Sequence, residues 1–411
     1  MMRVVVRVVL LLSAIMVRET QALSSSPSKT TDRRRFVERS AAALAATGLF
    51  PQVKSASAVA PNSDPGSPRP LVYRVEAGEP MSLQPLVGRA VGILERKIAE
   101  SADCVLVGAA RGDAEDAEIA ARVAKDLCFF AQRERRPVIL AMEAAPFGTF
   151  LPLKGEPSDV DAWPAAGPDP SWLRPFWDIE ADERIAIGVN PDTLRRIQQK
   201  GLSAMDATDR QLYVRDDEKF ANYPTKTIGY DVYADRVIGR KYDQRYANDT
   251  NAPQRANYIA SAVLQHEAAA TRLANALQRR QGKKPPLVIA IVSDDDLKFG
   301  HGIQGRLERL PILSSASVSV SDDGAAQGGE SKQLFPTVLS ILCNPTAPST
   351  YSLTPRLRLA ITLFPENQPR KLADYLWFSA SPPPNLIPNM FNPIDGQFKI
   401  DFGLSTGGSA I

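Results

Sequence analysis

Cysteine is scarce in this chain, and most of the chain lacks long apolar runs. Its 411 residues include three cysteines, at positions 104, 128 and 343, which are far apart and odd in number. A disulfide framework is therefore not expected. Beyond residue 60 no run approaches the roughly 18 apolar residues that a membrane helix needs, so we predict no transmembrane segment in the mature chain. We find no internal repeat.

A basic surface is also lacking once the first 60 residues are set aside. The whole chain has a formal charge of +3, but residues 1–60 contain 9 basic and 3 acidic side chains. The remaining residues contain 40 basic and 43 acidic side chains. This balance lacks the positive field that nucleic-acid-binding proteins use. We therefore expect no nucleic-acid partner. A small-molecule ligand is a possible partner, because of the polar side chains at the strand ends described below.

The first 60 residues are typical of targeting signals in series. An apolar run at residues 8–17, too short to cross a membrane, precedes a small-residue cleavage site at residues 20–22. Residues 23–31 are rich in Ser and Thr and free of acids, as in plastid transit peptides, and the arginines at 33–35 begin a twin-arginine signal. This order predicts delivery to the thylakoid lumen of a plastid; the alternative is an ordinary secreted protein. Residues 61–70, rich in Pro and Ser, are expected to form a flexible lead-in.

The rest of the chain, residues 71–411, alternates buried strands with amphipathic helices. Apolar runs at residues 104–108, 137–142 and 287–292 have the unbroken pattern of strands that are buried on both faces. Apolar residues at helical spacing fill residues 114–132, which completes a βαβ unit between the first two strands. These patterns predict an α/β fold with a mostly parallel central sheet flanked by helices.

Longer segments separate and follow these strands. Residues 146–175 are rich in Pro, Gly and Trp without periodicity, and predict a long loop over the pocket side of the sheet. Helical patterns dominate residues 176–281, so we expect a largely helical insertion between the second and third strands. Its longest helix is expected at residues 252–281. Short strands are expected within residues 334–411.

Polar side chains gather where the three predicted strands end. In an open parallel sheet, ligands bind beyond the carboxyl ends of the strands. The side chains at those positions are Arg111, Asp113, Glu143, Asp294, Asp296, Lys298 and His301. Carboxylates placed together can hold a hard cation, or raise one another's pKa for acid–base chemistry. We expect Asp113, Glu143 and Asp296 to converge in one crevice and to bind a ligand there.

The acidic side chains also have ordinary structural interpretations. Asp113 is placed to cap the helix that follows it, because acids are favoured at helix N-termini. Glu143 suits the end of an apolar strand as well as a pocket lining. Asp294 and Asp296 suit a solvated turn as well as a ligand site.

The basic side chains and histidines leave similar alternatives. Arg111, in a glycine-flanked turn, suits an anion as well as a surface salt bridge. His301, between two glycines, suits a loop as well as an axial ligand position. His266 lies midway along the longest helical pattern and is expected to be structural.

Short blocks at the three strand ends resemble those of a known family. They are Gly108-Ala-Ala-Arg111 at the first strand and Met142-Glu143 at the second. The third has Ser-Asp-Asp-Asp at residues 293–296, then Lys298-Phe299 and Gly302-Ile-Gln-Gly-Arg-Leu307. In order and spacing these blocks resemble the ChaN-like haem-binding uptake family of the Tiki and erythromycin-esterase superfamily, over most of residues 100–310. The resemblance implies the α/β scaffold and a pocket for a flat tetrapyrrole or another anionic ligand.

The departures from the family pattern concern its metal-binding groups. Where the family has a glutamate and two histidines, this chain has Ala109, Arg111 and Asp296, and Gln304 replaces a proline. Alanine has no donor atom, and arginine repels a cation. Glu143 alone remains of the four polar groups, whereas a catalytic metal normally has three protein ligands. We therefore expect no catalytic metal centre of the superfamily type.

The function favoured by these observations is non-enzymatic. It is a ligand-binding protein of the thylakoid lumen that takes haem or a related tetrapyrrole. Tyrosine is one of the side chains that can hold haem iron. In the helical middle region Tyr230 and Tyr233, with Tyr242 and Tyr246, are candidate axial or stacking groups, and helix packing is their alternative role.

Two other functions remain as alternatives. In a degenerate hydrolase, Glu143 together with Asp113, Asp294 or Asp296 would have rebuilt an acid–base site or a metal site with oxygen ligands. In an assembly or scaffold protein, the pocket would be vestigial.

Overall fold

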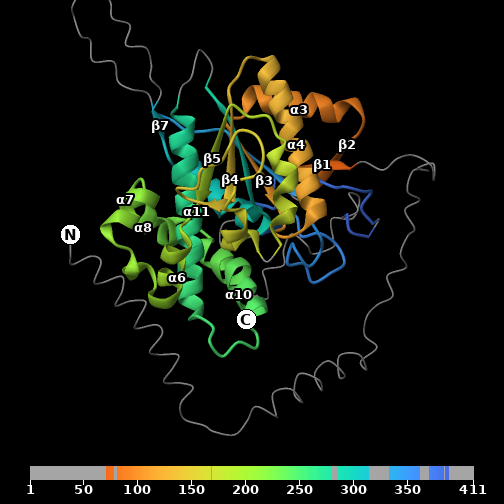
Figure 1. The fold of residues 1–411 in the computed structure, drawn as a ribbon. Helices are drawn as coiled ribbons and strands as arrows, with labels where there is room; N and C mark the ends of the chain where they lie inside the picture. The colour runs from red at the N-terminus through yellow and green to blue at the C-terminus, as the bar shows by residue number, and fades with distance from the viewer. Residues whose placement is uncertain are drawn as a thin grey trace, which may run out of the picture. The chain divides into compact units, whose positions relative to one another are not determined.

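An eight-stranded sheet organises the described part of the chain in the computed structural model (Figure 1). The strand order is β2-β1-β12-β9-β3-β6-β4-β5. In chain order the strands are β1 (Val72–Glu76), β2 (Ser82–Leu86), β3 (Cys104–Ala109), β4 (Val138–Pro146), β5 (Glu183–Gly188), β6 (Leu287–Ser293), β9 (Val338–Cys343) and β12 (Tyr375–Trp377). The strands from β12 to β5 are parallel, and β1 is antiparallel to both of its neighbours. The predicted α/β fold with a mostly parallel sheet is confirmed.

The structure describes residues 71–77, 81–167, 169–279, 285–313, 333–361, 370–383 and 385–387. The chain divides into two units, Met1–Ser67 and Pro68–Ile411, and all described residues belong to the second. The predicted targeting region, residues 1–60, and the lead-in, residues 61–70, lie outside the described residues.

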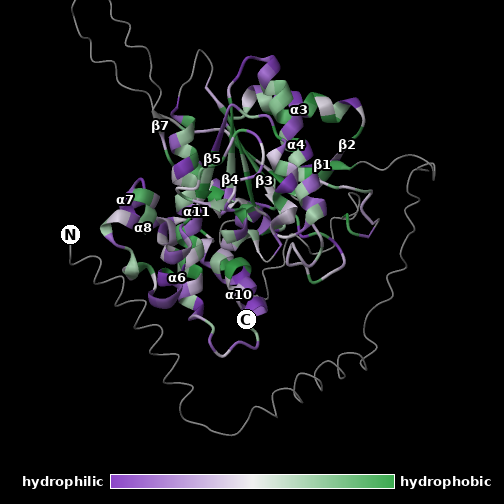
Figure 2. Ribbon diagram, in the orientation of Figure 1, coloured by the Kyte–Doolittle hydropathy of each residue, from purple (hydrophilic) through white to green (hydrophobic). Residues whose placement is uncertain are grey.

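The central strands are buried on both faces, which explains their unbroken apolar sequences. In β3, Val105 and Val107 belong to the core on one face, and Cys104 and Leu106 belong to the core on the other. Alternation of side chains along a strand produces this division. Figure 2 shows the central strands as mostly hydrophobic and the helices around them as mixed in hydropathy.

Helices cover both faces of the sheet. On one face lie α3 (Arg89–Ser101) and α4 (Ala114–Arg133), and on the other lies α11 (Arg255–Leu277) (Figure 1). Asp113 caps the N-terminus of α4, and its carboxylate accepts two backbone N–H groups of the first turn. All three cysteines are free and buried. No helix in the described part of the chain is both long and apolar enough to span a bilayer.

The predicted insertion is largely helical but begins with an edge strand. Strand β5 at Glu183–Gly188 lies within the range predicted to be helical, and it pairs only with β4. Because half of its residues are only partly buried, β5 lacks the continuous apolar run that identified the central strands. The helices that follow are α6 (Pro191–Lys200), α7 (Ala207–Tyr213), α8 (Asp217–Lys226), α9 (Tyr230–Tyr233), the π-helix η5 (Ala234–Gly239) and α10 (Arg240–Arg245).

The proline-rich segment that follows β4 packs against the sheet as short helical turns. These are η1 (Val160–Ala162), η2 (Pro164–Ala166), η3 (Pro170–Leu173) and α5 (Arg174–Trp177). Trp163, Trp172 and Trp177 are buried in the same core as α4. The segment that we predicted as a loop thus forms part of the core.

Short elements complete the fold after β6. They are α12 (Asp294–Leu297), η6 (Lys298–Gly300), α13 (Ile303–Leu307), β7 (Ile312–Leu313), β8 (Gln333–Leu334), β10 (Ala360–Ile361) and β11 (Arg370–Lys371). Of the short strands expected near the C-terminus, β9 and β12 join the main sheet. Strand β10 pairs with β11 outside the main sheet.

Candidate functional site

The carboxyl ends of β3, β6 and β4 lie side by side, because these strands are neighbours in the sheet. From β3 the chain crosses to β4 on one side, and from β6 it returns to β9 on the other. Neighbouring strands whose connections leave in opposite directions open a crevice at their carboxyl ends, where α/β proteins bind ligands. The candidate site is built around this crevice.

A buried glutamate is paired with an arginine in the crevice. Nη2 of Arg111 lies 2.7 Å from Oε1 of Glu143, and Oε2 accepts a 2.6 Å hydrogen bond from the backbone N–H of Ser293. The Glu143 side chain is 3% exposed and the Arg111 side chain 30%. Burial raises the pKa of Glu143 to about 7; Arg111 opposes this shift and the nearby Asp296 adds to it. Glu143 is therefore able to change its charge near neutral pH.

Asp296 joins this pair to the helical insertion. Its Oδ2 lies 3.5 Å from Nη2 of Arg111, and its Oδ1 lies 2.9 Å from Nε2 of His266, which is fully buried in α11. Burial opposes ionisation of Asp296. His266, Lys241 and Arg111 outweigh that effect and hold the pKa of the carboxyl well below its usual range. Asp296 is thus a fixed negative charge.

The two preceding aspartates form a second ion-pair group. Nζ of Lys298, a side chain only 1% exposed, lies 2.5 Å from Oδ2 of Asp294 and 2.9 Å from Oδ1 of Asp295. Lys241 Nζ lies 2.8 Å from Oδ2 of Asp295, and the Tyr351 hydroxyl donates a 2.9 Å hydrogen bond to Oδ1. Burial opposes ionisation of Asp295, but the two lysines outweigh it and lower the pKa of the carboxyl. The Asp-Asp-Asp segment is therefore a largely buried ion-pair network and not a solvated turn.

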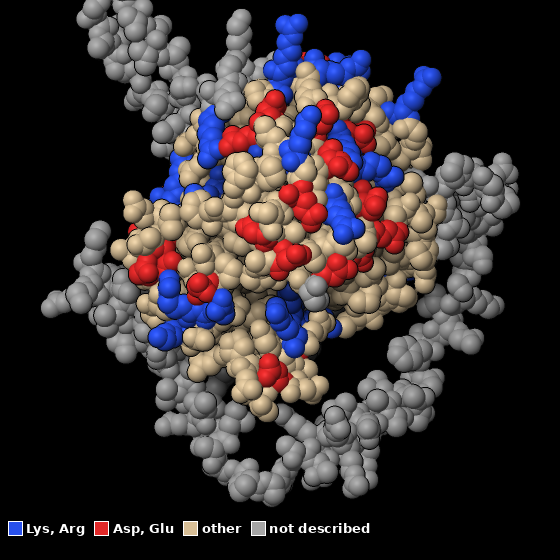
Figure 3. Space-filling view, in the orientation of Figure 1, with Lys and Arg blue, Asp and Glu red and all other residues tan. Residues whose placement is uncertain are grey.

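A cavity of about 300 Å³ lies against this network. Its charged lining residues are Arg111, Arg195, Lys241, Arg245, Asp295 and Asp296. Its apolar lining residues include Pro164, Pro191, Leu194, Val237, Ile238 and Ala262. Both acids already have basic partners, and Arg245, whose guanidinium lies over the Tyr246 ring, has no carboxylate partner among the described residues, so the lining is favourable for an anion. The wider surface differs from the cavity, because acidic and basic side chains are interspersed on the face seen in Figure 3.

One tyrosine, Tyr258, lines the cavity. Its ring packs against the rings of Tyr242 and Tyr246, with centroids 5.4 Å and 5.8 Å away. The Tyr242 hydroxyl donates a 2.7 Å hydrogen bond to the carbonyl of Pro253, whereas the Tyr258 hydroxyl has no hydrogen-bond partner among the described residues. Burial raises the pKa of Tyr258, against the opposing charges of Lys241 and Arg245. The Tyr258 hydroxyl is thus available to a ligand.

The structure brings together five of the predicted site residues: Arg111, Glu143, Asp294, Asp296 and Lys298. Of the three acids expected to converge, Glu143 and Asp296 do so, bridged by Arg111. Asp113 instead is exposed and caps α4, which was its structural alternative.

The other predicted residues pack in the core behind the network. Tyr230 and Tyr233 are buried; the Tyr230 hydroxyl accepts from Arg306, and the Tyr233 hydroxyl donates to the backbone carbonyl of Asp295. His301 is fully buried 5.5 Å from the Tyr233 ring, and neither ring nitrogen has a hydrogen-bond partner within the described residues. Burial lowers the pKa of His301 to about 4, assisted by the charge of Arg370. Neither these tyrosines nor His301 line the cavity.

Several residues of the site were not predicted as such. His266 was expected only to support its helix, and no local pattern singled out Lys241, Tyr258 or Tyr351. The four-residue spacing of Lys241 and Arg245, which puts both on one helix face, was the one available signal for a cationic wall. No three His, Cys, Asp or Glu side chains are grouped as a metal site in the part of the chain that the structure describes.

The sequence matches no protein-family model and no curated protein. Among solved structures, the chain is similar to ChaN of Campylobacter jejuni, whose structure is described as showing cofacial heme binding. The similarity covers 74% of this chain and 96% of that chain, at 8% sequence identity and with a TM-score of 0.36. It is a distant structural likeness.

Proposed function

We propose that this chain is a non-catalytic ligand-binding protein, and that its cavity takes haem or a related tetrapyrrole. The observation that carries the proposal is the lining of the cavity, where four cationic side chains face two already paired acids beside an apolar wall. A ligand with carboxylate groups on a flat apolar ring satisfies both parts of that lining.

The residues present fit haem in two respects. Arg195 and Arg245 are exposed side chains of the lining that can pair with ligand carboxylates, although Arg195 also pairs with the exposed Asp192 at 2.7 Å. Tyr258 supplies a phenol oxygen, one of the axial ligands that haem iron accepts. The cavity volume of about 300 Å³ is at the low end for small-molecule sites, so one edge of the tetrapyrrole is expected to remain in solvent.

Titration of the full chain with haemin tests the proposal. We expect a shifted Soret band that saturates at one haem per chain and changes in Tyr258→Phe. The matched control is Tyr375→Phe, which alters a half-buried tyrosine on β12. A spectrum without a shift, or one that Tyr258→Phe leaves unaltered, would count against the haem assignment. Tyr230→Phe and Tyr233→Phe test the two tyrosines predicted from the sequence.

The arginines give a second test that does not depend on iron. In Arg195→Gln/Arg245→Gln the affinity for metal-free protoporphyrin should fall about tenfold or more, since each lost charge-assisted hydrogen bond contributes roughly 1.5–3 kcal/mol. Arg133→Gln, on the exposed side of α4, is the control. Equal binding by the double variant and the control would show that Arg195 and Arg245 do not hold the ligand.

A hydrolase is the second candidate, favoured by one observation. Glu143, with a pKa raised by burial to about 7, lies beside Asp296, which is paired with His266. Such a group suits a general base. Ester hydrolysis by the full chain that disappears in Glu143→Gln would support this candidate. Hydrolysis that persists in the variant would place the chemistry elsewhere.

We further propose that the protein resides in the thylakoid lumen. The support is the order of the predicted signals in residues 1–60. Fused to a fluorescent protein in a plastid-bearing cell, these residues should deliver the fusion to the lumen. A fusion that carries both Arg34→Lys and Arg35→Lys should remain in the stroma. Secretion of the wild-type or the variant fusion would instead favour an ordinary secreted protein.

A further inference from the structure

Arg111 lies between the ligand cavity and the buried Glu143. It lines both the cavity of about 300 Å³ and a smaller one of about 10 Å³, whereas Glu143 lines only the smaller one. The smaller cavity has room for no more than one water molecule. A ligand in the larger cavity can therefore contact Arg111, and it affects Glu143 through that arginine.

A single nitrogen of Arg111 makes both of its ion pairs. Nη2 lies 2.7 Å from Oε1 of Glu143 and 3.5 Å from Oδ2 of Asp296. The other two guanidinium nitrogens, Nη1 and Nε, have no hydrogen-bond partner among the described residues, and the side chain is 30% exposed. Their N–H groups are thus available to an anionic group in the cavity.

The carboxylate of Glu143 depends on Arg111 for its charge balance. Its side chain is 3% exposed, and Arg111 is the one basic side chain that pairs with it in the described part of the chain. From β6 the Ser293 N–H donates to Oε2 at 2.6 Å, and beyond Arg111 lies the negative charge of Asp296. From η3 comes the apolar Trp172. A buried carboxylate with one cation becomes harder to ionise when another anion shares that cation.

The two aspartates that line the cavity each keep a second partner. Oδ1 of Asp296 lies 2.9 Å from Nε2 of His266 on α11, and Asp295 pairs with both Lys241 and Lys298. An added negative charge raises the energy of every carboxylate near Arg111, and the carboxylate with the fewest partners is the first to accept a proton. That carboxylate belongs to Glu143, whose pKa burial already raises to about 7.

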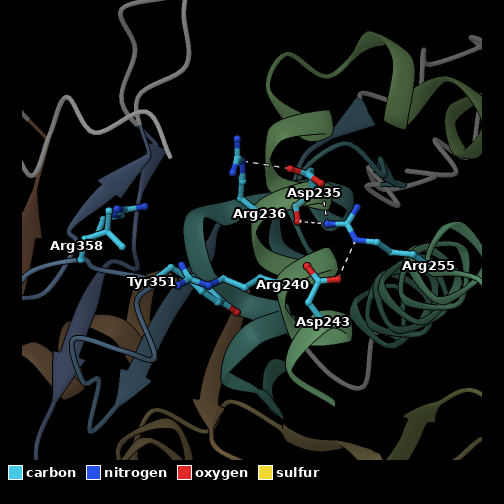
Figure 4. Close-up of a pocket in the computed structure, with 8 residues that line it drawn as sticks. Asp235, Arg236, Arg240, Asp243, Arg255, Tyr351 and Arg358 are labelled. Atoms are coloured by element: carbon cyan, nitrogen blue, oxygen red, sulfur yellow. Dashed lines mark hydrogen bonds and ion pairs between the residues drawn. The ribbon is translucent and has the colours of Figure 1, made fainter. Parts of the chain in front are cut away.

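The acids on the other side of the η5–α10 segment are screened by solvent. Asp235 and Asp243 pair with Arg255 at 2.7 Å and 3.3 Å, and their side chains are 49% and 59% exposed (Figure 4). Exposed carboxylates of this kind interact weakly with charges across the segment. Glu143 is therefore the acid whose protonation we expect to respond to a ligand in the cavity.

We propose that the cavity binds its anionic ligand together with one proton, which Glu143 takes from solvent when a ligand carboxylate pairs with Arg111. This coupling rests on the proposed function, since a tetrapyrrole carries carboxylates that compete for Arg111. In the balanced step, the free protein, the ligand anion and one proton give a complex in which Arg111 pairs with the ligand and with Asp296. Glu143 is then a neutral carboxyl group that still accepts the Ser293 N–H.

The coupling makes ligand binding stronger at lower pH. Above its pKa of about 7, Glu143 is ionised in the free protein, so ligand binding takes up close to one proton. Below that pKa Glu143 already holds the proton, and the uptake disappears.

Fluorescence titration of the full chain with metal-free protoporphyrin, near pH 7 and about two pH units higher, tests the coupling. The wild-type dissociation constant should rise by up to about tenfold for each pH unit, because one proton accompanies each ligand. Glu143→Gln imitates the protonated carboxyl group, so its dissociation constant should lack that rise. At the higher pH this variant should bind about tenfold more tightly than the wild type. A substitution that only disturbed the fold would weaken binding instead.

Glu118→Gln, at an exposed position on α4, is the matched control and should follow the wild type at both pH values. Any pH dependence of the porphyrin itself is common to all variants and cancels in their ratios. Infrared difference spectroscopy at the higher pH gives a second measurement. On binding, the wild type should gain the band of a protonated carboxyl group, and Glu143→Gln should not.

The possible outcomes distinguish this coupling from the proposed function. A ratio of the wild-type and Glu143→Gln dissociation constants that is the same at both pH values would overturn the coupling and leave the tetrapyrrole site intact. Weaker binding by Glu143→Gln than by the wild type at the higher pH would also overturn the coupling. Absence of porphyrin binding by the wild type at both pH values would overturn the proposed function and the coupling with it. Thermal unfolding without ligand checks that every variant is folded.

Discussion

Nε2 of His266 lies 2.9 Å from Oδ1 of Asp296, and this contact joins the helical insertion to the carboxyl edge of the sheet. His266 belongs to α11, whereas Asp296 belongs to the short helix directly after β6. Lys241 and Asp295 make a second link of the same kind, from α10 to the same short helix. The candidate site therefore requires the insertion to be folded against the sheet.

Removal of the Asp296 carboxylate should destabilise the protein strongly. Asp296→Ala leaves Arg111 and the fully buried His266 without this partner. Breaking a buried ion pair from one side costs about 3 kcal/mol or more. Urea unfolding followed by circular dichroism measures the change in the free energy of unfolding.

An exposed ion pair supplies the control for this prediction. Glu100 pairs with Arg96 at 2.7 Å on α3, with side chains 41% and 61% exposed. Glu100→Ala should change the free energy of unfolding by no more than about 0.5 kcal/mol, because solvent screens such pairs. Similar losses in the two variants would show that the Asp296 network adds nothing beyond a surface pair.

The pKa of Glu143 predicts a pH dependence that its amide variant should lack. The folded-state pKa of about 7 lies above the ordinary value of 4.5, so between these values the folded state holds a proton that the unfolded state has released. The contribution of Glu143 to stability therefore falls as the pH rises from 4.5 to 7, by up to about 3 kcal/mol.

The stability difference between wild type and Glu143→Gln measures this contribution. Urea unfolding at several pH values should show the wild type losing stability relative to the variant as the pH rises. Glu118→Gln, an exposed position on α4, is the control and should show no such trend. A constant difference would mean that Glu143 keeps the same charge throughout, held ionised by Arg111 and the Ser293 N–H.

Much of the fold and half of the candidate site were predictable, because both depend on local patterns. The unbroken apolar runs of β3, β4 and β6 identified parallel strands, and parallel strands place their carboxyl ends at one edge. That rule places Arg111, Glu143 and Asp296 at one edge of the sheet. Strand β5 was missed, because an edge strand needs fewer apolar residues and its sequence resembles its helical surroundings.

The remaining part of the site depends on tertiary packing that no local pattern encodes. Lys241 and His266 reach Asp295 and Asp296 only because α10 and α11 fold back over the sheet edge. Tyr351 reaches the same network from a turn between β9 and β10. A sequence pattern predicts which residues along one helix or strand are polar or apolar. It does not predict which distant elements pack against each other.

His301 should make the protein sensitive to acid. Burial lowers its pKa from 6.5 to about 4. Between pH 4 and pH 6.5 the unfolded state therefore binds a proton that the folded state does not bind. Stability due to this residue is therefore complete above pH 6.5 and is lost as the pH falls toward 4, by up to about 3 kcal/mol. The stability difference between wild type and His301→Phe, measured by urea unfolding across this range, isolates the effect from that of Glu143. A difference that does not vary with pH would contradict it.

Gly302 is expected to tolerate no side chain, because the chain passes too close to Asp296. A Cβ atom at Gly302 would overlap the carbonyl oxygen of Asp296 and lie 3.0 Å from the Tyr233 hydroxyl. Gly302→Ala should therefore lower the free energy of unfolding by more than about 2 kcal/mol, as overpacking against backbone does. Gly92 is the matched control: it lies inside α3, and a Cβ there meets nothing within 4 Å. Gly92→Ala should stabilise the protein by about 0.5–1 kcal/mol, because alanine is the better helix former. Equal effects of the two substitutions in urea unfolding would mean that the turn between η6 and α13 does not approach Asp296 as closely as described.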